Sequence, residues 1–261
     1  MKKILCFILI CLMFLSNLCI TIYAESVNIS DSTSAILLRA GGGSGGSGGG
    51  GSGGGSGGSA GAASHSGTGQ APTLLESVIQ AIVMPFALFS SSVIFYINLT
   101  KRSRKSKKLM KQMMQSDNAW KFKDISAAVS DSYYAVQTAW TNMDMTPAAE
   151  YMSDELYDSF QTKLNWMKYR NQKNVLENIK LIRALPVAVH DDSDNSLDYV
   201  WFYIKGKMID YIIDTNTQLK ISGNTAPTAF TEYWQFVRKE NKWVLNKILQ
   251  KNESDQIPFN E

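Results

Sequence analysis

The C-terminal third of the chain alternates between apolar and polar side chains in the manner of paired strands. Residues 230–250 alternate, turn at 239–242 and alternate again, which predicts two antiparallel strands. Residues 199–213 form a long run rich in aromatic and β-branched side chains, and residues 175–189 carry apolar side chains at every second position. Both segments are therefore predicted strands.

Helical periodicity precedes these strands. From Asp124 onward, apolar side chains recur every three or four positions as far as Trp140, which predicts an amphipathic helix. Two more helix starts follow, at Thr146-Pro147 and at Ser153. Helices followed by a strand meander predict an α+β fold with the helices on one face of an antiparallel sheet.

A third pattern is continuously apolar. Residues 78–97 contain no charged side chain and only Gln80 is clearly polar. Such a helix is long enough to cross about 30 Å of hydrocarbon. The alternative is a buried core helix, but soluble helices of this length seldom lack charges. We therefore predict a single transmembrane helix at residues 76–98.

The N-terminal residues have the pattern of a targeting segment. Lys2 and Lys3 precede an apolar run, and small Ala24 closes it, which predicts a signal peptide over residues 1–24. An uncleaved signal anchor is the alternative. The three cysteines lie inside this segment, so the mature chain is expected to have no disulfide and no thiol chemistry. They are Cys6, Cys11 and Cys19.

Glycine and serine dominate the next segment. Of the 19 glycines in the chain, 17 lie between residues 41 and 69. A chain with so few side chains to bury and so much backbone freedom predicts a flexible extracytoplasmic segment over residues 25–75. No strand precedes the glycines and no Gly-Lys-Ser/Thr sequence ends them, so a phosphate-binding loop is not expected.

The predicted span is followed by a strongly basic run, in a juxtamembrane segment at residues 99–118. Basic clusters stay on the cytoplasmic side of a membrane. We therefore expect a single-pass protein of the bacterial cell membrane, with its soluble domain on the cytoplasmic side. The same side chains are candidate ligands for anionic lipid headgroups, although topology alone would also explain them. They are Lys101, Arg102, Arg104, Lys105, Lys107, Lys108 and Lys111.

The rest of the chain has the opposite charge. Residues 120–261 contain 16 basic and 19 acidic side chains, a net charge of −3. A weakly acidic domain, together with a basic run that has no interleaved aromatics, is a poor nucleic-acid binder. Nucleic acid is therefore excluded as a partner.

Several short motifs occur in a fixed order along the soluble part. Together they resemble the C-terminal domain of the mitochondrial import inner membrane translocase subunit 44 family (Tim-44-like), which has bacterial membrane-anchored relatives. The resemblance covers residues 119–251, followed by a flexible tail at 252–261. The motifs are Gln137-Thr-Ala-Trp140 with Asp144, Asn174-Val-Leu-Glu-Asn-Ile179, Asp210-Tyr-Ile-Ile-Asp214, Phe230-Thr-Glu-Tyr-Trp-Gln-Phe-Val-Arg238, Trp243-Val-Leu245 and Ile248-Leu-Gln250.

The resemblance implies a cone of the nuclear transport factor 2 type, in which three helices pack on a strongly curved antiparallel sheet that encloses a pocket. The mitochondrial N-terminal segment, which engages the chaperone and the translocon, has no counterpart here. A role in protein import therefore does not carry over, and only the membrane-proximal binding domain does.

One acid stands in an aromatic row: Glu232 shares its strand face with Phe230, Trp234 and Phe236. A buried carboxylate is unfavourable unless it is paired or hydrogen-bonded. Glu232 is therefore expected to accept hydrogen bonds inside the cone, and a pocket role is the alternative. The pocket candidates are Glu232, Asp210, Tyr203 and Trp234, with Asp198 and His190 nearby.

A pair of pocket carboxylates suits general acid/base chemistry, but no nucleophile, metal-ligand cluster or phosphate loop accompanies these acids. The acids after His190, at 191–194, lack the ligand spacing of a calcium loop and predict a solvated turn. No catalytic residue, metal or cofactor is expected. Most of the six tryptophans should be core, with one or two at a pocket or a membrane-facing edge.

These observations favour a non-enzymatic, membrane-anchored module that binds membrane lipids, including anionic ones, or a membrane-protein partner. Two alternatives remain open. One is a small-molecule pocket enzyme, an isomerase or hydrolase on the same cone. The other is a scaffold or tether in membrane-protein biogenesis.

Overall fold

The computed structural model describes residues 74–259, except for the side chains of residues 74–89 and 91. The predicted signal peptide and the glycine-rich segment lie outside the described residues. The chain divides into two compact units. Helix α2 belongs to both units, and every later element lies in the unit that contains residues 97–259.

The first element is α2 (Leu74–Met113), a single helix of 40 residues. It joins the predicted span and the basic segment, which the sequence had suggested as separate parts. No helix among the described residues is long and apolar enough to cross a membrane. Most of residues 76–98 lack described side chains. The transmembrane helix is thus unsupported by the structure and stays a prediction.

Two of the three predicted helices of the soluble domain are present as α-helices. After the short η1 (Asn118–Trp120), α3 (Phe122–Thr141) buries the apolar stripe that its sequence predicts. The second predicted start gives only η2 (Thr146–Tyr151), a 3₁₀ helix with proline in its first turn. It ends because Ser153 already caps α4 (Asp154–Tyr169), accepting a hydrogen bond from the backbone N–H of Leu156 at 3.3 Å.

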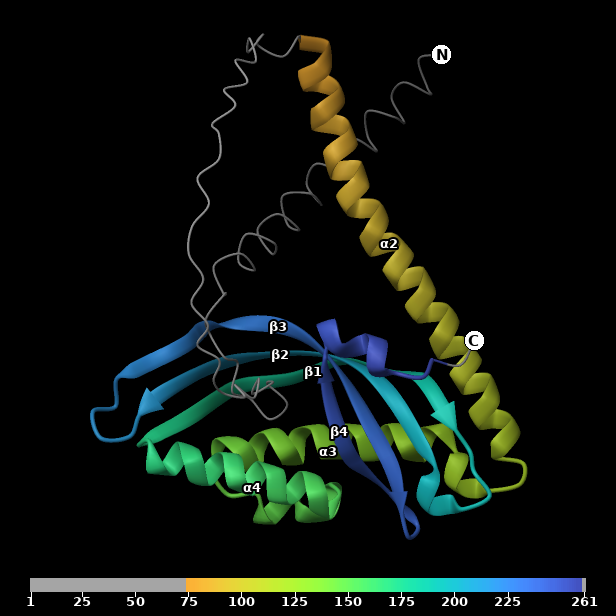
Figure 1. Cartoon of the computed structure of the whole chain (residues 1–261), viewed down its shortest axis with the longest axis vertical. Helices are drawn as coiled ribbons and strands as arrows, with labels where there is room; N and C mark the ends of the chain where they lie inside the picture. Colours follow the sequence, from red (N-terminus) through yellow and green to blue (C-terminus); the bar gives the residue numbers. More distant parts are fainter. Residues whose placement is uncertain (1–73, 260–261) are drawn as a thin grey trace, which may run out of the picture. The chain divides into compact units, whose positions relative to one another are not determined.

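Four antiparallel strands follow in the order β1-β2-β3-β4. Helices α3 and α4 lie on one face of this open sheet (Figure 1). The α+β prediction is therefore confirmed, and the arrangement is consistent with a cone. The strands are β1 (Gln172–His190), β2 (Tyr199–Asp214), β3 (Lys220–Lys239) and β4 (Lys242–Gln250), with short 3₁₀ turns η3 (Asn195–Leu197) and η4 (Lys251–Gln256).

Bulges interrupt the register of β1. The pairing with β2 shifts between Glu177 and Lys180, again before Arg183, and again after Pro186. Asn178, inside the first bulge, has a φ of 53°. Each bulge bends the strand and changes which face the following residues occupy. The single period of two expected for residues 175–189 is therefore wrong, and four consecutive residues, 186–189, are buried.

Strand β3 begins ten residues earlier than the sequence indicated. Its first half contains Gly223, Asn224 and Pro227 and is mostly exposed, so it has neither the composition nor the alternation of a typical strand. The tail predicted at 252–261 is not free as far as it is described: Ile257 is buried, and the ring of Phe259 packs edge-on against Tyr233.

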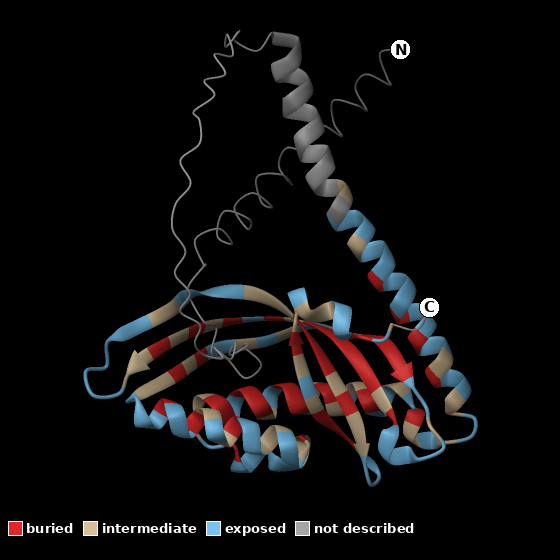
Figure 2. Ribbon diagram, viewed as in Figure 1, coloured by how far each residue is buried: buried red, intermediate tan, exposed pale blue. Residues whose placement is uncertain are grey.

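Buried residues lie on α3, on α4 and on the strands of the sheet (Figure 2), and they form one hydrophobic core. Tryptophan, tyrosine and phenylalanine side chains supply most of its volume, and several are completely inaccessible. This aromatic packing occupies the region where the sequence suggested a pocket. The largest buried side chains include Trp120, Trp140, Trp234, Tyr133, Phe160, Phe202 and Phe236.

Candidate functional site

Glu232 is fully buried and accepts hydrogen bonds from two neighbours. The Nε1–H of Trp234 donates to Glu232 Oε2 at 2.9 Å, and Nε2 of Gln250 donates to Oε1 at 3.1 Å. Gln250 lies directly opposite Glu232 on β4. The expectation that this carboxylate accepts hydrogen bonds within the sheet is confirmed, and the contacts link β3 to the end of β4.

Asp210 belongs to a second buried network. Nδ2 of Asn174 donates to Asp210 Oδ1 at 2.7 Å, while Asn174 Oδ1 accepts from Trp140 Nε1–H at 2.9 Å. Beside this chain, the hydroxyl of Thr141 donates to the carbonyl of Asn174 at 3.1 Å and accepts from the N–H of Leu176 at 3.0 Å. The network ties the C-terminal end of α3 to β1 and β2.

Tyr203 and Trp234, the other two pocket candidates, are also buried. Tyr203 lies on the opposite sheet face from Trp234, with its ring edge-on to Tyr233 and its hydroxyl 3.4 Å from Thr231 Oγ1. None of the four candidates lines either of the two surface grooves described below. The structure places Glu232, Trp234 and Asp210 in hydrogen-bonded contacts of the fold rather than around one open site.

One groove, of about 360 Å³, lies between α3, η2 and the turn between β3 and β4. Its acidic side chains include Asp124, which pairs with Lys121 at 3.3 Å, and Glu150, which pairs with Lys242 at 3.4 Å. The other groove, of about 390 Å³, lies on α4 beside Trp166 and Tyr169.

An ion-pair triad, buried at Arg238 and Asp198 and half-buried at Asp117, joins three segments that are distant in sequence. Nη1 of Arg238 on β3 contacts both Asp117, in the turn after α2, and Asp198, just before β2; the separation from Asp198 Oδ2 is 3.2 Å. Burial raises the pKa of Asp198 above its ordinary value. The hydrogen bond from the N–H of Asp192 acts in the other direction, but burial has the larger effect. The N–H of Ala119 and the guanidinium of Arg238 lower the pKa of Asp117.

The acidic run after β1 forms a turn, as the sequence indicated. Asp192 and Asp194 accept hydrogen bonds from nearby backbone N–H groups, and Asp191 accepts one from Trp120 Nε1–H at 2.8 Å. His190 stacks on Tyr199 with ring centroids 5.1 Å apart. Within residues 74–259 no group of acidic, histidine or cysteine side chains is arranged to hold a metal ion.

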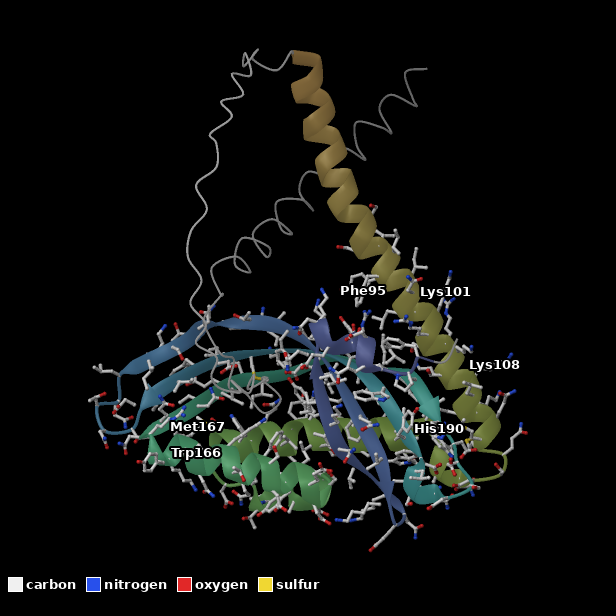
Figure 3. All side chains as sticks on the ribbon, in the orientation of Figure 1. Phe95, Lys101, Lys108, Trp166, Met167 and His190 are labelled. Carbon is white, nitrogen blue, oxygen red and sulfur yellow. The ribbon has the colours of Figure 1, made fainter. Side chains whose placement is uncertain are left out.

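The basic run forms one side of α2. The opposite side is a buried stripe spaced by four, three and four residues: Leu99, Ser103, Ser106 and Met110. All seven basic side chains are exposed. At roughly 100° per residue, five of them point away from this stripe, and Figure 3 shows Lys101 and Lys108 turned outward. We call these five the outer basic face; they are Lys101, Arg104, Lys105, Lys108 and Lys111.

The other two basic residues flank the buried stripe and contact aromatic rings of the domain. The guanidinium carbon of Arg102 lies 3.5 Å from the ring centroid of Phe259, and Lys107 Nζ lies 4.3 Å from that of Phe122. Cation–π contacts of this kind stabilise packing. The seven predicted headgroup ligands thus fall into two groups with different surroundings.

Comparison with known proteins identifies the family. The Tim44-like domain family matches residues 106–250, more than half of the chain. The chain belongs to the Tim44-like domain family. The resemblance inferred from the sequence motifs is thereby confirmed. Tim44-like domains are generally non-catalytic, and the family suggests a membrane-associated protein-interaction or binding module.

No curated protein matches the chain, but solved structures do. The intermembrane space region of the chloroplast protein ARC6 is similar, with 10% identity and a TM-score of 0.35 over 49% of this chain and 96% of that one. The putative transfer protein TraH from the Gram-positive conjugative plasmid pIP501 is similar, with 13% identity and a TM-score of 0.25 over 46% of this chain and 91% of that one.

Two features of this Tim44-like domain were not found from the sequence. Arg238 had no visible partners, because Asp117 lies 121 residues away and Asp198 lies 40 residues away. One or two tryptophans were expected outside the core, but it was not predicted which: Trp166 is 58% exposed, whereas the other five tryptophans are buried. The sequence pattern did indicate this exposure. The buried residues of α4 are Phe160, Leu164 and Met167, spaced by four and three positions, and Trp166 does not belong to that series.

Proposed function

We propose that this protein is a non-enzymatic binding module that its outer basic face holds against the anionic lipids on the cytoplasmic side of a bacterial membrane. The supporting observation is the two-sided character of α2. Its inner stripe is at most 5% exposed while every side chain of the outer basic face is exposed. Binding by that face leaves the packing of the domain intact.

The electrostatics favour a lipid surface. Near an anionic membrane each basic side chain contributes about 1 kcal/mol, and no acidic residue occurs between Lys101 and Lys111 to offset them. The domain that follows carries a net charge of −3, so its net charge adds no attraction to an anionic lipid surface. The positive charge is thus concentrated on one short helical segment.

Apolar side chains directly precede the basic face on the same helix. Val93, Ile94 and Ile97 are 39%, 56% and 48% exposed. Exposed apolar residues next to basic ones are typical of helices that meet the membrane interface. This order supports the proposal that the N-terminal part of α2 enters the bilayer and that the basic face lies at headgroup level.

The rest of the domain is proposed to act as a binding scaffold on a cone of the nuclear transport factor 2 type. Its polar core residues support this role over catalysis, because Glu232 and Asp210 are engaged in hydrogen bonds with Trp234, Gln250 and Asn174. A membrane protein is the proposed class of partner.

The test uses the full chain in proteoliposomes with spin-labelled lipids. The lipid preference is the ratio of motionally restricted phosphatidylglycerol to motionally restricted phosphatidylcholine around the protein. We expect a several-fold preference for phosphatidylglycerol that falls toward one, and weakens with salt, when Lys101, Arg104, Lys108 and Lys111 are replaced by Gln.

A matched control removes the same number of charges elsewhere. Lys123, Lys180, Lys207 and Lys247 are exposed on the domain, and their replacement by Gln should leave the preference unchanged. Equal loss in both variants would mean that net charge alone attracts the lipid. No preference in the unmodified protein would overturn the proposed function.

A further inference from the structure

Exposed apolar side chains gather at one end of the domain. Trp166 and Tyr169 come from the last turns of α4, and Leu219 and Ile221 come from the turn between β2 and β3 and the start of β3. They are 58%, 80%, 68% and 49% exposed. We call these four residues the aromatic tip.

Backbone contacts bring the two elements of the tip together. The N–H of Thr215 donates to the carbonyl of Asn171 at 2.8 Å, and Gln172 pairs with Asp214 at the start of β1. The end of α4 and the β2–β3 turn are therefore fixed side by side. Figure 3 shows Trp166 beside Met167 on α4. The two side chains are about 100° apart around the helix; Met167 is buried, whereas Trp166 is 58% exposed.

The side chains of the tip have an interfacial character. The rings of Trp166 and Tyr169 meet edge-on with centroids 6.0 Å apart, beside a groove of about 390 Å³ that Thr162 and Asn165 complete. Tryptophan and tyrosine combine an apolar ring with a polar atom, and they are enriched where hydrocarbon meets water. Two aliphatic side chains extend the apolar surface.

The charges around the tip are basic. Lys168, Arg170, Lys173 and Lys220 lie within four residues of its members along the chain, and the Arg170 guanidinium lies 6.0 Å from the Trp166 ring centroid. Two acids also lie near these residues: Asp214 accepts hydrogen bonds from the N–H groups of Asn216 and Thr217 at 2.8 Å each, and Asp144 interacts with Lys168. Long basic side chains around an apolar surface suit anionic headgroups.

We infer that the aromatic tip is a second membrane-contacting surface, which inserts Trp166 and Tyr169 among the headgroups of an anionic bilayer. It goes beyond the proposed function because none of its residues belongs to α2. A contact at the far end of the sheet would fix the orientation of the domain on the bilayer, which a single helical attachment leaves free.

The test measures the environment of Trp166 in the full chain. The protein is reconstituted into vesicles of brominated phosphatidylcholine and phosphatidylglycerol, and tryptophan emission of the unmodified protein is compared with that of Trp166→Phe. We expect bromine to quench a component of the emission that is lost in Trp166→Phe, because the other tryptophans are buried in protein. Replacing Lys168 and Arg170 by Gln should shrink the quenched component.

Equal quenching in the unmodified protein and in Trp166→Phe would overturn the inference. Full quenching of the Trp166 emission by aqueous iodide in the vesicle sample would also overturn it, because Trp166 would then face water. That result would favour a protein, rather than lipid, as the partner of the aromatic tip. The spin-label preference measured on the same samples reports the outer basic face separately, so loss of the tip contact with retained lipid preference contradicts this inference alone.

Discussion

The guanidinium of Arg238 lies 3.2 Å from the carboxylate of Asp198, and the two side chains are 8% and 0% exposed. Asp117, from the turn after α2, contacts the same nitrogen. The triad therefore connects the segment that leaves the basic helix with the ends of two strands. A buried charge that loses its partner is strongly destabilising, so this connection should matter for stability.

Arg238→Ala is expected to lower the free energy of unfolding by about 3–5 kcal/mol, since it leaves Asp198 buried without its cation. Urea denaturation measures the change. The neighbouring Lys239→Ala is the control: Lys239 pairs with Asp154 at 2.7 Å, but the side chains are 47% and 86% exposed, and such pairs contribute about 1 kcal/mol or less. Similar losses in both variants would contradict a structural role for the triad.

The pH dependence of stability should change in Asp198→Asn. The folded-state pKa of Asp198 is raised by burial, so its folded form holds a proton that the unfolded chain has already lost. Its contribution to the free energy of unfolding is therefore fully present below the ordinary pKa of about 3.9 and is lost as pH rises through the folded pKa. The difference in the free energy of unfolding between the unmodified protein and Asp198→Asn should therefore decline as the pH rises through that window.

Urea titrations from acidic to neutral pH measure this decline. Asp154→Asn, at an exposed site, should give a curve parallel to that of the unmodified protein. A difference in the free energy of unfolding between Asp198→Asn and the unmodified protein that stays constant across the whole pH window would contradict the raised pKa of Asp198.

The Trp140–Asn174–Asp210 network predicts a large effect from a nearly isosteric change. Asn174→Leu removes the acceptor of the Trp140 Nε1–H and the donor to Asp210. Buried polar groups left without their partners are unfavourable by about 1–3 kcal/mol each, so we expect a loss of at least about 2 kcal/mol in chemical denaturation. Asn165→Leu, on the exposed side of α4, should change stability by about 0.5 kcal/mol or less.

Close packing at Gly206 gives a fourth prediction. A Cβ there would lie 2.4 Å from both Phe230 Cζ and Tyr133 Oη, and these side chains belong to the packed interior between α3 and the sheet. Gly206→Ala should therefore lower the free energy of unfolding by about 1–3 kcal/mol. Thermal unfolding measures this loss, and Lys207→Ala, at the exposed neighbouring position, is the control. Equal melting temperatures for Gly206→Ala and Lys207→Ala would show that the site accommodates a methyl group.

Part of the fold followed from local pattern. Helix α3 and the hairpin of β3 and β4 were predictable because an amphipathic element that buries one face shows its period in the sequence. The side of the sheet on which each β1 side chain lies was not predictable, because each bulge reverses the alternation. Asn178, with its positive φ, does not by itself show where the bulges occur. The start of β3 was hidden because exposed edge residues such as Thr225 and Pro227 need no apolar period.

The candidate site was predictable in composition but not in geometry. The seven basic residues are evident from the sequence, yet their division depends on which side of α2 is buried, and Ser103 and Ser106 in that stripe are polar. The contact of Arg102 with Phe259 joins residues at opposite ends of the domain sequence. Likewise, Glu232 could be recognised as unusual, but its partner Gln250 became evident only from the strand register.

The central claim is that the outer basic face meets anionic lipid while its flanking cations hold the helix to the domain. Two variants of equal charge test it directly: Lys101→Gln with Lys108→Gln, and Arg102→Gln with Lys107→Gln. The measurement is the spin-label preference for phosphatidylglycerol over phosphatidylcholine, with the melting temperature of each variant. The account predicts that the first pair lowers the preference at an unchanged melting temperature, and that the second lowers the melting temperature with the preference largely retained. An equal loss of preference in both pairs would contradict it.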